Sequence, residues 1–221
     1  MHARARSYYR IGAFVSVAAA MLLPSAATGQ VWLQKEVVRD LTGDGAPDTL
    51  QLTAVGRQSD SLTISLVIRV AGRVAYRDTW KSIYYFQYDL PIHTLRRVYI
   101  DSLVRAELNG FFSPESFQPP DTQHLVESAD EDEHGARSHI AREMKQGRYL
   151  REHGIARDQL STSDYRAIDR ITVDSGEVNA IANDILRHTK LAFTYFSGGE
   201  DTRTIAWSTL KRRFYVIWGC C

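Results

Sequence analysis

Apolar and polar residues alternate along short segments near the start of the chain. From 62 to 70 every second residue is apolar, and of the residues between them only Val67 is also apolar. Residues 50–54 alternate in the same way, and residues 31–38 supply a further apolar segment. A period of two is typical of a β-strand with one buried face. The glycine turn at 71–73 leads into a fourth segment, so we expect an antiparallel meander here.

The same alternation returns near the end of the chain. Apolar residues occupy every second position from 191 to 195, and Gly198-Gly199 is placed to turn the chain. Residues 204–207 and 214–218 then supply two more apolar segments, with a second turn at 209–212. The pattern predicts a second antiparallel meander. It is compatible with one sheet shared by both meanders and with two separate sheets.

Between the meanders, the spacing of apolar residues changes to that of helices. Asp89 and Pro91 are placed to open a helix, and Gly110 is placed to end it. The apolar face of this helix is expected to consist of Ile92, Leu95, Tyr99 and Leu103.

Three further helices are predicted in the second half of the chain. Charged helices are expected at 138–152 and 163–171. A more clearly amphipathic helix is expected at 175–188, burying Val178, Ile181 and Ile185. The stretch from Ser113 to Arg137 holds three prolines, the acidic run 130–133 and few apolar residues, which predicts a loop or mobile linker.

Strands at both ends and helices in the middle indicate an α+β fold, in which the helical middle packs on an antiparallel sheet. Residues 30–221 are enough for one hydrophobic core, so we predict a single domain.

The first 29 residues have the organisation of a secretory signal peptide. Arg4, Arg6 and Arg10 give a basic start, and the apolar run 11–23 is followed by Pro24 and several small residues. This run is shorter than the roughly 20 residues that a bilayer-spanning helix needs. The alternative is an uncleaved N-terminal anchor. We expect cleavage near residue 29, no membrane span afterwards, and a location in the periplasm or outside the cell.

Charge and cysteine content exclude several classes of protein. The 221-residue chain has 27 Lys and Arg against 26 Asp and Glu, which gives no electrostatic footprint for nucleic acid. Without the three arginines of residues 1–29, 24 basic and 26 acidic residues remain, a formal charge of −2. The two cysteines are adjacent, Cys220 and Cys221, and two cysteines cannot form a disulfide scaffold. They remain open to a strained disulfide, an intermolecular bridge or two free thiols.

Residues 40–48 carry the pattern with the most specific chemistry. Side chains that contain oxygen stand at the first, third, fifth and ninth positions, and Gly45 stands at the sixth. Calcium takes about six to eight oxygen ligands, and alternate residues of a tight loop can converge on one ion. The expected ligands are the side chains of Asp40, Thr42, Asp44 and Asp48 and the carbonyl of Ala46.

This segment resembles the aspartate-rich calcium loops of FG-GAP and VCBS-type repeats, in which the loop joins two β-strands. The resemblance covers residues 40–48 only and implies a structural calcium ion. The segment also resembles the start of an EF-hand loop, but the twelfth position is Gln51 instead of glutamate, and residues 49–55 alternate as a strand. The alternative is a metal-free hairpin loop, closed by Asp and Thr side chains that bind backbone N–H groups.

Two other groups of residues are candidates for function. His134 and His139 lie beside the acidic run 130–133, where a zinc site with a carboxylate base is conceivable, although their spacing is not H-E-x-x-H. Solvated polar residues are the alternative. The aromatic segment 83–88 is suited to stacking on sugars or to binding a protein, and core packing is the alternative.

The sequence contains no nucleophile elbow, P-loop or dinucleotide-binding motif. We therefore expect an exported, non-enzymatic binding module of the bacterial envelope, with a calcium loop and an unknown protein or glycan as partner. The rival hypothesis is an exported metal-dependent hydrolase that uses His134, His139 and neighbouring acids. A third hypothesis is an envelope chaperone or inhibitor that uses residues 83–88.

Overall fold

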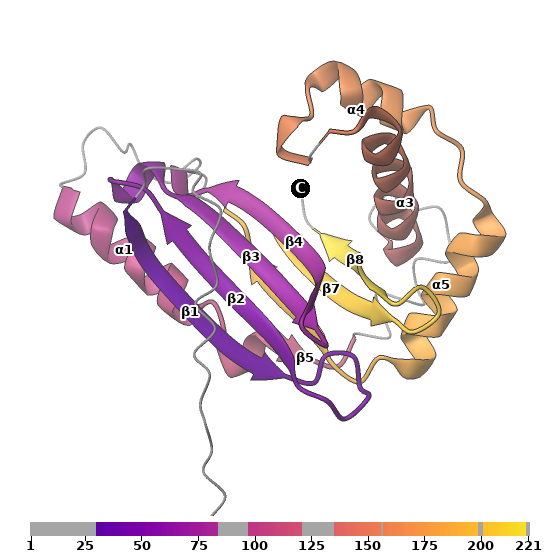
Figure 1. The fold of residues 1–221 in the computed structure, drawn as a ribbon, viewed down its shortest axis with the longest axis horizontal. Helices are drawn as coiled ribbons and strands as arrows, with labels where there is room; N and C mark the ends of the chain where they lie inside the picture. The colour runs from indigo at the N-terminus through magenta and orange to yellow at the C-terminus, as the bar shows by residue number, and fades with distance from the viewer. Residues whose placement is uncertain (1–29, 84–96, 121–134, 156, 199–200, 220–221) are drawn as a thin grey trace, which may run out of the picture.

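The computed structural model describes residues 30–83, 97–120, 135–155, 157–198 and 201–219 (Figure 1). The predicted signal peptide, the aromatic residues 84–88, His134 and the two cysteines lie outside the described residues. The elements are, in chain order, β1 (Val31–Arg39), β2 (Asp48–Val55), η1 (Ser59–Ser61), β3 (Thr63–Val70), β4 (Arg73–Lys81), α1 (Arg97–Gly110), η4 (Pro114–Ser116), β5 (Phe117–Gln118), α3 (Ala136–His153), η6 (Arg157–Gln159), α4 (Thr162–Asp169), α5 (Ser175–His188), β6 (Ala192–Phe196), β7 (Thr202–Ser208) and β8 (Arg213–Gly219). Strands lie near both ends of the chain and helices in the middle, so the predicted α+β class is confirmed.

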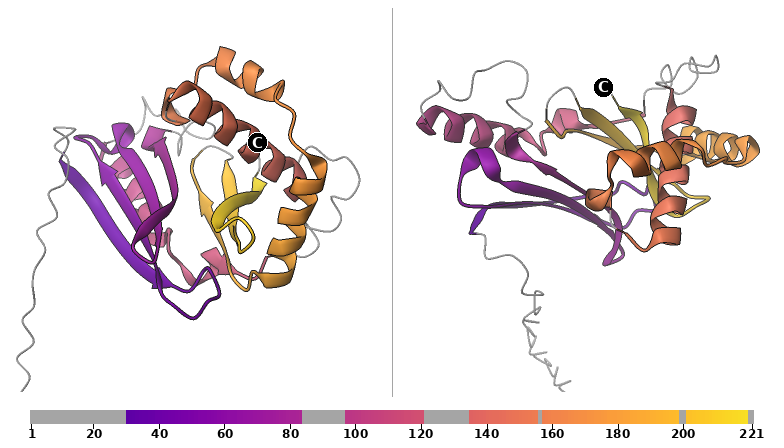
Figure 2. Two further views of the ribbon diagram at one scale, coloured as in Figure 1. Left: turned by 45° about the vertical axis from the view of Figure 1, so that its right-hand side comes forward. Right: turned by 90° about the horizontal axis from the view of Figure 1, so that it is seen from above.

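The first meander forms a four-stranded sheet, here called sheet A. Its strand order is β1-β2-β3-β4, with every neighbouring pair antiparallel. The inward side chains of β2 and β3 are fully buried, and Leu52 lies directly opposite Leu66. The residues between them, such as Val67, point to an outer face that no element of the described part of the chain covers (Figure 2). Sheet A therefore has one buried face, as its alternating sequence predicts.

The second meander forms a separate sheet, here called sheet B. Its order is β5-β6-β7-β8, and all neighbouring pairs are again antiparallel. One face packs against sheet A, through Ile205, Trp207, Phe214 and Val216. The other face packs beneath α3 and α5, through Ala206, Tyr215 and Ile217. Because both faces are buried, the sequence of β8 is almost continuously apolar instead of alternating.

Helix α1 lies beside sheet B, on the inner face of sheet A (Figure 2). Its buried residues are Ile100, Val104 and Leu108, spaced one turn apart. The predicted apolar face was wrong for Tyr99, which is 49% exposed, whereas Leu103 is partly buried and packs against the core. Ile92 and Leu95 lie outside the described residues. The helix sequence contains two apolar stripes, and the buried one continues into Phe111, which stacks on Trp80 of sheet A.

The remaining helices α3, α4 and α5 overlap the helices predicted at 138–152, 163–171 and 175–188. Helix α5 begins and ends where predicted and buries Val178, Ile181 and Ile185. Helix α4 opens with a capping box between Ser161 and Asp164. None of the helices that the structure describes is long and apolar enough to cross a membrane.

The structure differs from the predicted loop of residues 113–137 at both of its ends. Phe117 and Gln118 form β5, which pairs with β6, and Phe117 stacks on Phe193 with 4.9 Å between ring centroids. At the other end, α3 already begins at Ala136. The aromatic ring of Phe117 stabilises this short strand, and a two-residue strand is too brief for an alternating pattern to reveal.

Candidate functional site

Residues 40–48 join β1 to β2, as predicted, and their carboxylates bind the backbone of the loop. Asp40 accepts hydrogen bonds from the N–H groups of Gly43 (2.7 Å) and Gly45 (2.9 Å). Asp44 accepts one from the N–H of Ala46 (2.8 Å). Gly43 and Gly45 have φ angles of 74° and 86°, a conformation that favours glycine. The three hydrogen bonds close the loop, and the one from Ala46 to Asp44, two residues apart, is an Asx turn.

Asp48 closes the base of the same loop. Its Oδ2 accepts hydrogen bonds from the N–H groups of Leu41 (2.9 Å) and Thr42 (3.0 Å), and the residue is only 1% exposed. Burial raises the pKa of Asp48, and the two backbone hydrogen bonds oppose this rise. Thr42 also contacts Asp40 (Oγ1 to Oδ1, 3.4 Å).

The five predicted calcium ligands thus lie in one loop, and the carboxylates of Asp40, Asp44 and Asp48 accept hydrogen bonds from its backbone N–H groups. Within the described residues, no group of three or more His, Cys, Asp or Glu side chains is placed to hold a metal ion. An ion at this loop would share the Asp40 oxygens, Asp44 Oδ1 and Asp48 Oδ2 with the N–H groups that already bind them.

His139, the described histidine of the hydrolase hypothesis, lies inside the protein. It is 7% exposed on α3, and its ring packs against Gly219 of β8, where an added Cβ would lie 3.3 Å from its Cε1. Its predicted partner His134 lies outside the described residues. The described part of the chain therefore adds no support for a catalytic centre at this position.

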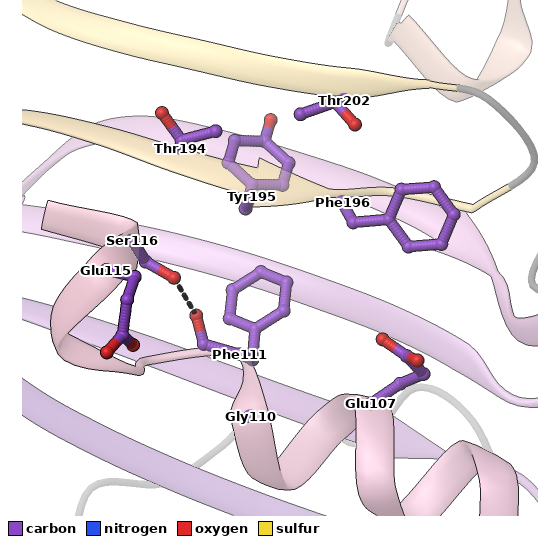
Figure 3. Close-up of a pocket in the computed structure, with 9 residues that line it drawn as sticks. All are labelled: Glu107, Gly110, Phe111, Glu115, Ser116, Thr194, Tyr195, Phe196 and Thr202. Carbon is purple, nitrogen blue, oxygen red and sulfur yellow. Dashed lines mark hydrogen bonds between the residues drawn. The ribbon is translucent and has the colours of Figure 1, made fainter.

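A pocket of about 320 Å³ lies between the end of α1 and the strands β6 and β7 (Figure 3). We call it the α1–β6 pocket. Its lining residues are Glu107, Gly110, Phe111, Glu115, Ser116, Thr194, Tyr195, Phe196 and Thr202. The partly exposed ring of Phe196 and the hydroxyl groups of Ser116, Thr194 and Thr202 therefore line one open pocket, and the buried rings of Phe111 and Tyr195 lie beneath it. Its volume is within the usual size range of ligand sites.

Rigid elements position the aromatic walls of this pocket. Phe111 directly follows α1 and lies 5.8 Å from Tyr195 between ring centroids. Trp80 of sheet A stacks on both rings, at 5.8 Å from each. Phe196 lies one residue beyond Tyr195, on the opposite face of β6. The rings of Phe111 and Tyr195 are thus fixed by the core behind them.

The hydroxyl groups of the pocket differ in the interactions they already make. Ser116 donates to the carbonyl of Phe111 (3.2 Å), as Figure 3 shows. Thr194 shares a hydrogen bond with Thr204 on the neighbouring strand (2.9 Å). Each hydroxyl can still accept a hydrogen bond from a ligand, because a hydroxyl oxygen has two lone pairs.

The charge of the pocket is negative. Glu107 rises from α1 at one end and Glu115 lies beside Ser116 at the other (Figure 3), and both are exposed. The pKa of Glu115 is lowered by hydrogen bonds from its own backbone N–H and from Ser113. None of the nine lining residues is basic.

Behind the pocket, the hydroxyl of Tyr195 enters a buried group of polar side chains that joins the two sheets. It donates to Asp78 of β4 (2.6 Å) and shares a hydrogen bond with the hydroxyl of Tyr76 (2.8 Å). Arg203 of β7 forms an ion pair with the same oxygen of Asp78 (2.6 Å) and a second with Asp201 (2.5 Å). We call Tyr76, Asp78, Tyr195 and Arg203 the inter-sheet polar cluster.

Electrostatics fix the protonation of this cluster. Burial raises the pKa of both tyrosines, and the charge of Asp78 raises them further. Burial alone would lower the pKa of Arg203, but Asp78 holds it above its usual range. At neutral pH the phenols therefore stay neutral and the guanidinium stays charged, so the cluster is a fixed structural contact.

The lining of the α1–β6 pocket contains aromatic rings, hydroxyl groups and two exposed carboxylates. Sequence reasoning missed the pocket because residues 107–116 and 194–202 meet only in the fold. The nearest available signal was the Gly110-Phe111-Phe112 sequence, where a helix stop precedes two aromatic residues.

Comparison with known proteins gives no match to this chain, whether with protein family models, with curated sequences or with solved structures.

Proposed function

We propose that this chain is an exported, non-enzymatic binding module of the bacterial envelope, and that it binds a glycan in the α1–β6 pocket. The observation that carries the proposal is the combination of the partly exposed ring of Phe196 with hydroxyl and carboxylate groups around one surface pocket. Sugar rings present apolar C–H faces that pack on aromatic rings, and hydroxyl groups that need hydrogen-bond partners. The predicted signal peptide supports an envelope or extracellular setting.

The size and openness of the site suit one or two sugar units of a longer chain. A volume of about 320 Å³ is at the lower end of ligand pockets. Glu107 and Glu115 are exposed at its two ends, where they can accept hydrogen bonds from sugar hydroxyls. Phe196 and Thr202 belong to adjacent strands and form the wall opposite α1.

Binding is tested with the protein purified after export and a panel of chitin, chitosan and peptidoglycan oligosaccharides. Trp80 stacks on two of the pocket rings, so tryptophan fluorescence is expected to report binding, and titration calorimetry provides an independent measurement. We expect saturable binding of at least one oligosaccharide. The variant Phe196→Ala is expected to weaken it about tenfold, since one stacking contact is removed.

The matched control is Tyr165→Ala on α4, which removes an aromatic side chain that is 51% exposed away from the pocket. This variant is expected to bind like the unmodified protein. Failure of every oligosaccharide to bind, or equal losses in both variants, would overturn the glycan function. Release of reducing ends from a bound oligosaccharide would overturn its non-enzymatic character.

Export has its own test. Expression of the full precursor, followed by cell fractionation and N-terminal sequencing, is expected to give a chain that begins at Thr28 or Gln30 in the periplasm or the medium. A chain that retains Met1 and stays in the membrane fraction would identify an uncleaved anchor instead.

The structural calcium ion at residues 40–48 stays a prediction of the sequence. Its test compares thermal unfolding in calcium and in chelator. If the ion binds, calcium raises the melting temperature and Asp44→Ala abolishes the rise. If the loop is closed by backbone donors alone, chelator changes nothing. Asp48→Ala is then still expected to cost about 2 kcal/mol, because two buried N–H groups lose their acceptor.

A further inference from the structure

The outer face of sheet A, which no element of the described part of the chain covers (Figure 2), carries more basic than acidic side chains. Arg77 and Lys81 of β4 point outward, because the residues that alternate with them on this strand are buried against the core. Arg69 of β3 points to the same side, two residues beyond the residue opposite Arg77. The one outward carboxylate on the described strands of this sheet, Glu36, belongs to β1, three strand spacings or about 14 Å from β4. Basic groups therefore gather on the β3–β4 half of this face.

The hydrogen-bond partners of these basic groups are neutral. Arg69 donates from Nη1 to Gln51 Oε1 (3.0 Å), and Lys81 donates from Nζ to Thr63 Oγ1 (2.6 Å). Within the described ranges, none of Arg69, Arg77 and Lys81 forms an ion pair. A guanidinium has five N–H donors and an ammonium three, so most of these donors remain available to an anion. The neutral acceptors orient two of the groups and leave their charges without a counterion.

Hydroxyl groups lie between the charged positions. Thr53, Ser65 and Thr79 form one row across β2, β3 and β4, and the row passes between Arg77 and Lys81. Ser65 and Thr79 share a hydrogen bond of 3.4 Å, so each hydroxyl keeps further donor or acceptor capacity. Neighbouring rows are about 7 Å apart along the strands. An extended molecule on this face therefore meets positive charges and hydroxyl groups at short, regular intervals.

We propose that the outer face of sheet A binds an acidic polysaccharide, whose carboxylates pair with Arg69, Arg77 and Lys81. Arginine suits this partner, because its planar group can pair with a carboxylate through two parallel hydrogen bonds. The sugar hydroxyls meet the row that contains Ser65 and Thr79. An acidic polysaccharide is favoured over an anionic membrane, since none of the outward residues of β2, β3 and β4 is aromatic, leucine or isoleucine.

This surface is separate from the α1–β6 pocket, which lies on the inner side of sheet A. The inference therefore goes beyond the function proposed for that pocket, and the two can fail independently.

The test compares a decamer of galacturonic acid with the same decamer esterified by methanol at every carboxyl group. Titration calorimetry at neutral pH and low salt measures both affinities. We expect the acidic decamer to bind at least about tenfold more tightly than the ester and to bind less tightly as salt is added. The triple variant Arg69→Gln, Arg77→Gln and Lys81→Gln is expected to lower its affinity at least about tenfold. These side chains point away from the core, so circular dichroism is expected to show an unchanged fold.

The matched control is the triple variant Arg142→Gln, Arg151→Gln and Arg166→Gln. It removes the same charge from exposed positions of α3 and α4. It is expected to keep the affinity for the acidic decamer within about twofold of that of the parent protein. Equal losses in the two triple variants, or equal affinity for the acidic decamer and its ester, would overturn the proposal.

Two further measurements separate this face from other sites. Phe196→Ala in the α1–β6 pocket is expected to leave binding of the acidic decamer unchanged, and a loss in this variant would assign the decamer to the pocket instead. Vesicles of anionic phospholipid are expected not to compete with the decamer. Binding of these vesicles with rejection of the decamer would overturn the polysaccharide in favour of a membrane surface.

Discussion

Sheet A and sheet B have the same number of strands and the same antiparallel order, yet they are used differently. Sheet A buries one face, and no element of the described part of the chain covers the other, whereas β7 and β8 of sheet B are buried on both faces. The sequences show this difference, because apolar and polar residues alternate along β3, whereas β8 is almost continuously apolar. Sheet B is thus the central layer of the molecule, and the proposed ligand pocket lies where its strand β6 meets α1.

The largest expected effect on stability comes from comparing a threonine substitution in each sheet, on the face that points away from the other sheet. Ile217 of β8 is 3% exposed beneath α3, and Val67 of β3 lies on the open face of sheet A. Ile217→Thr is expected to cost about 2–4 kcal/mol, because it removes buried methyl groups and buries a hydroxyl. Val67→Thr keeps the β-branched shape and is expected to change stability by less than about 0.5 kcal/mol.

Urea unfolding followed by circular dichroism measures both values. Similar losses in the two variants would contradict the distinction between a central and an outer sheet.

The next effect concerns the contact between the sheets. Asp78→Ala removes the acceptor of Tyr195 and one partner of Arg203, and is expected to cost about 2–3 kcal/mol. Tyr195→Phe removes one hydrogen bond and is expected to cost about 1 kcal/mol. Equilibrium unfolding of both variants provides the comparison. If Asp78→Ala costs no more than Tyr195→Phe, the ion pair with Arg203 does not hold the sheets together.

A smaller effect concerns the turn between β7 and β8. Burial would raise the pKa of Asp184, but hydrogen bonds from the N–H of Leu210 and from Thr209, Ser208 and His188 lower it from 3.8 to about 2. A carboxyl with a lowered pKa stabilises the fold above its unfolded pKa and loses this contribution as pH falls through its folded pKa. The contribution is therefore complete above about pH 5 and is lost toward pH 2.

Asp184→Asn is expected to cost about 1–2 kcal/mol at neutral pH and much less near pH 2. Urea unfolding of the variant and the parent at several pH values tests whether their stabilities become equal toward pH 2. A difference between variant and parent that stays constant with pH would show that the charge of Asp184 is not what binds the turn.

The smallest effect concerns a turn of sheet A. The loop between β3 and β4 consists of Ala71 and Gly72, with φ angles of 48° and 77°. Positive φ is unfavourable for alanine, so Ala71→Gly is expected to stabilise the protein by about 0.5–1 kcal/mol. Ala46→Gly, in the hairpin of β1 and β2, is the control, because Ala46 does not have positive φ. A loss of stability in Ala71→Gly would contradict this account.

Much of the fold could be predicted because its strands and helices are regular over enough residues. The alternation of apolar and polar residues spans at least four pleats in β2 and in β3. The helical spacing of apolar residues spans at least two turns in α5. The buried face of α1 could not be predicted, since Leu103 and Val104 belong to two competing apolar stripes. The choice between them depends on Phe111 and Trp80, which lie far apart in sequence. The pocket was missed for the same reason, because Glu107 and Thr202 become neighbours only after folding.

The inter-sheet polar cluster also has a consequence for the time course of folding. Asp78 precedes its partners Tyr195 and Arg203 by 117 and 125 residues. At ribosomal rates of about 5–20 residues per second, Arg203 is made about 6–25 s after Asp78. The hairpins of sheet A, whose contacts are local, can form during this interval. A nascent chain that has completed sheet A therefore exposes the inner face of this sheet until its last two strands are made. Aggregation competes most strongly with folding during this period.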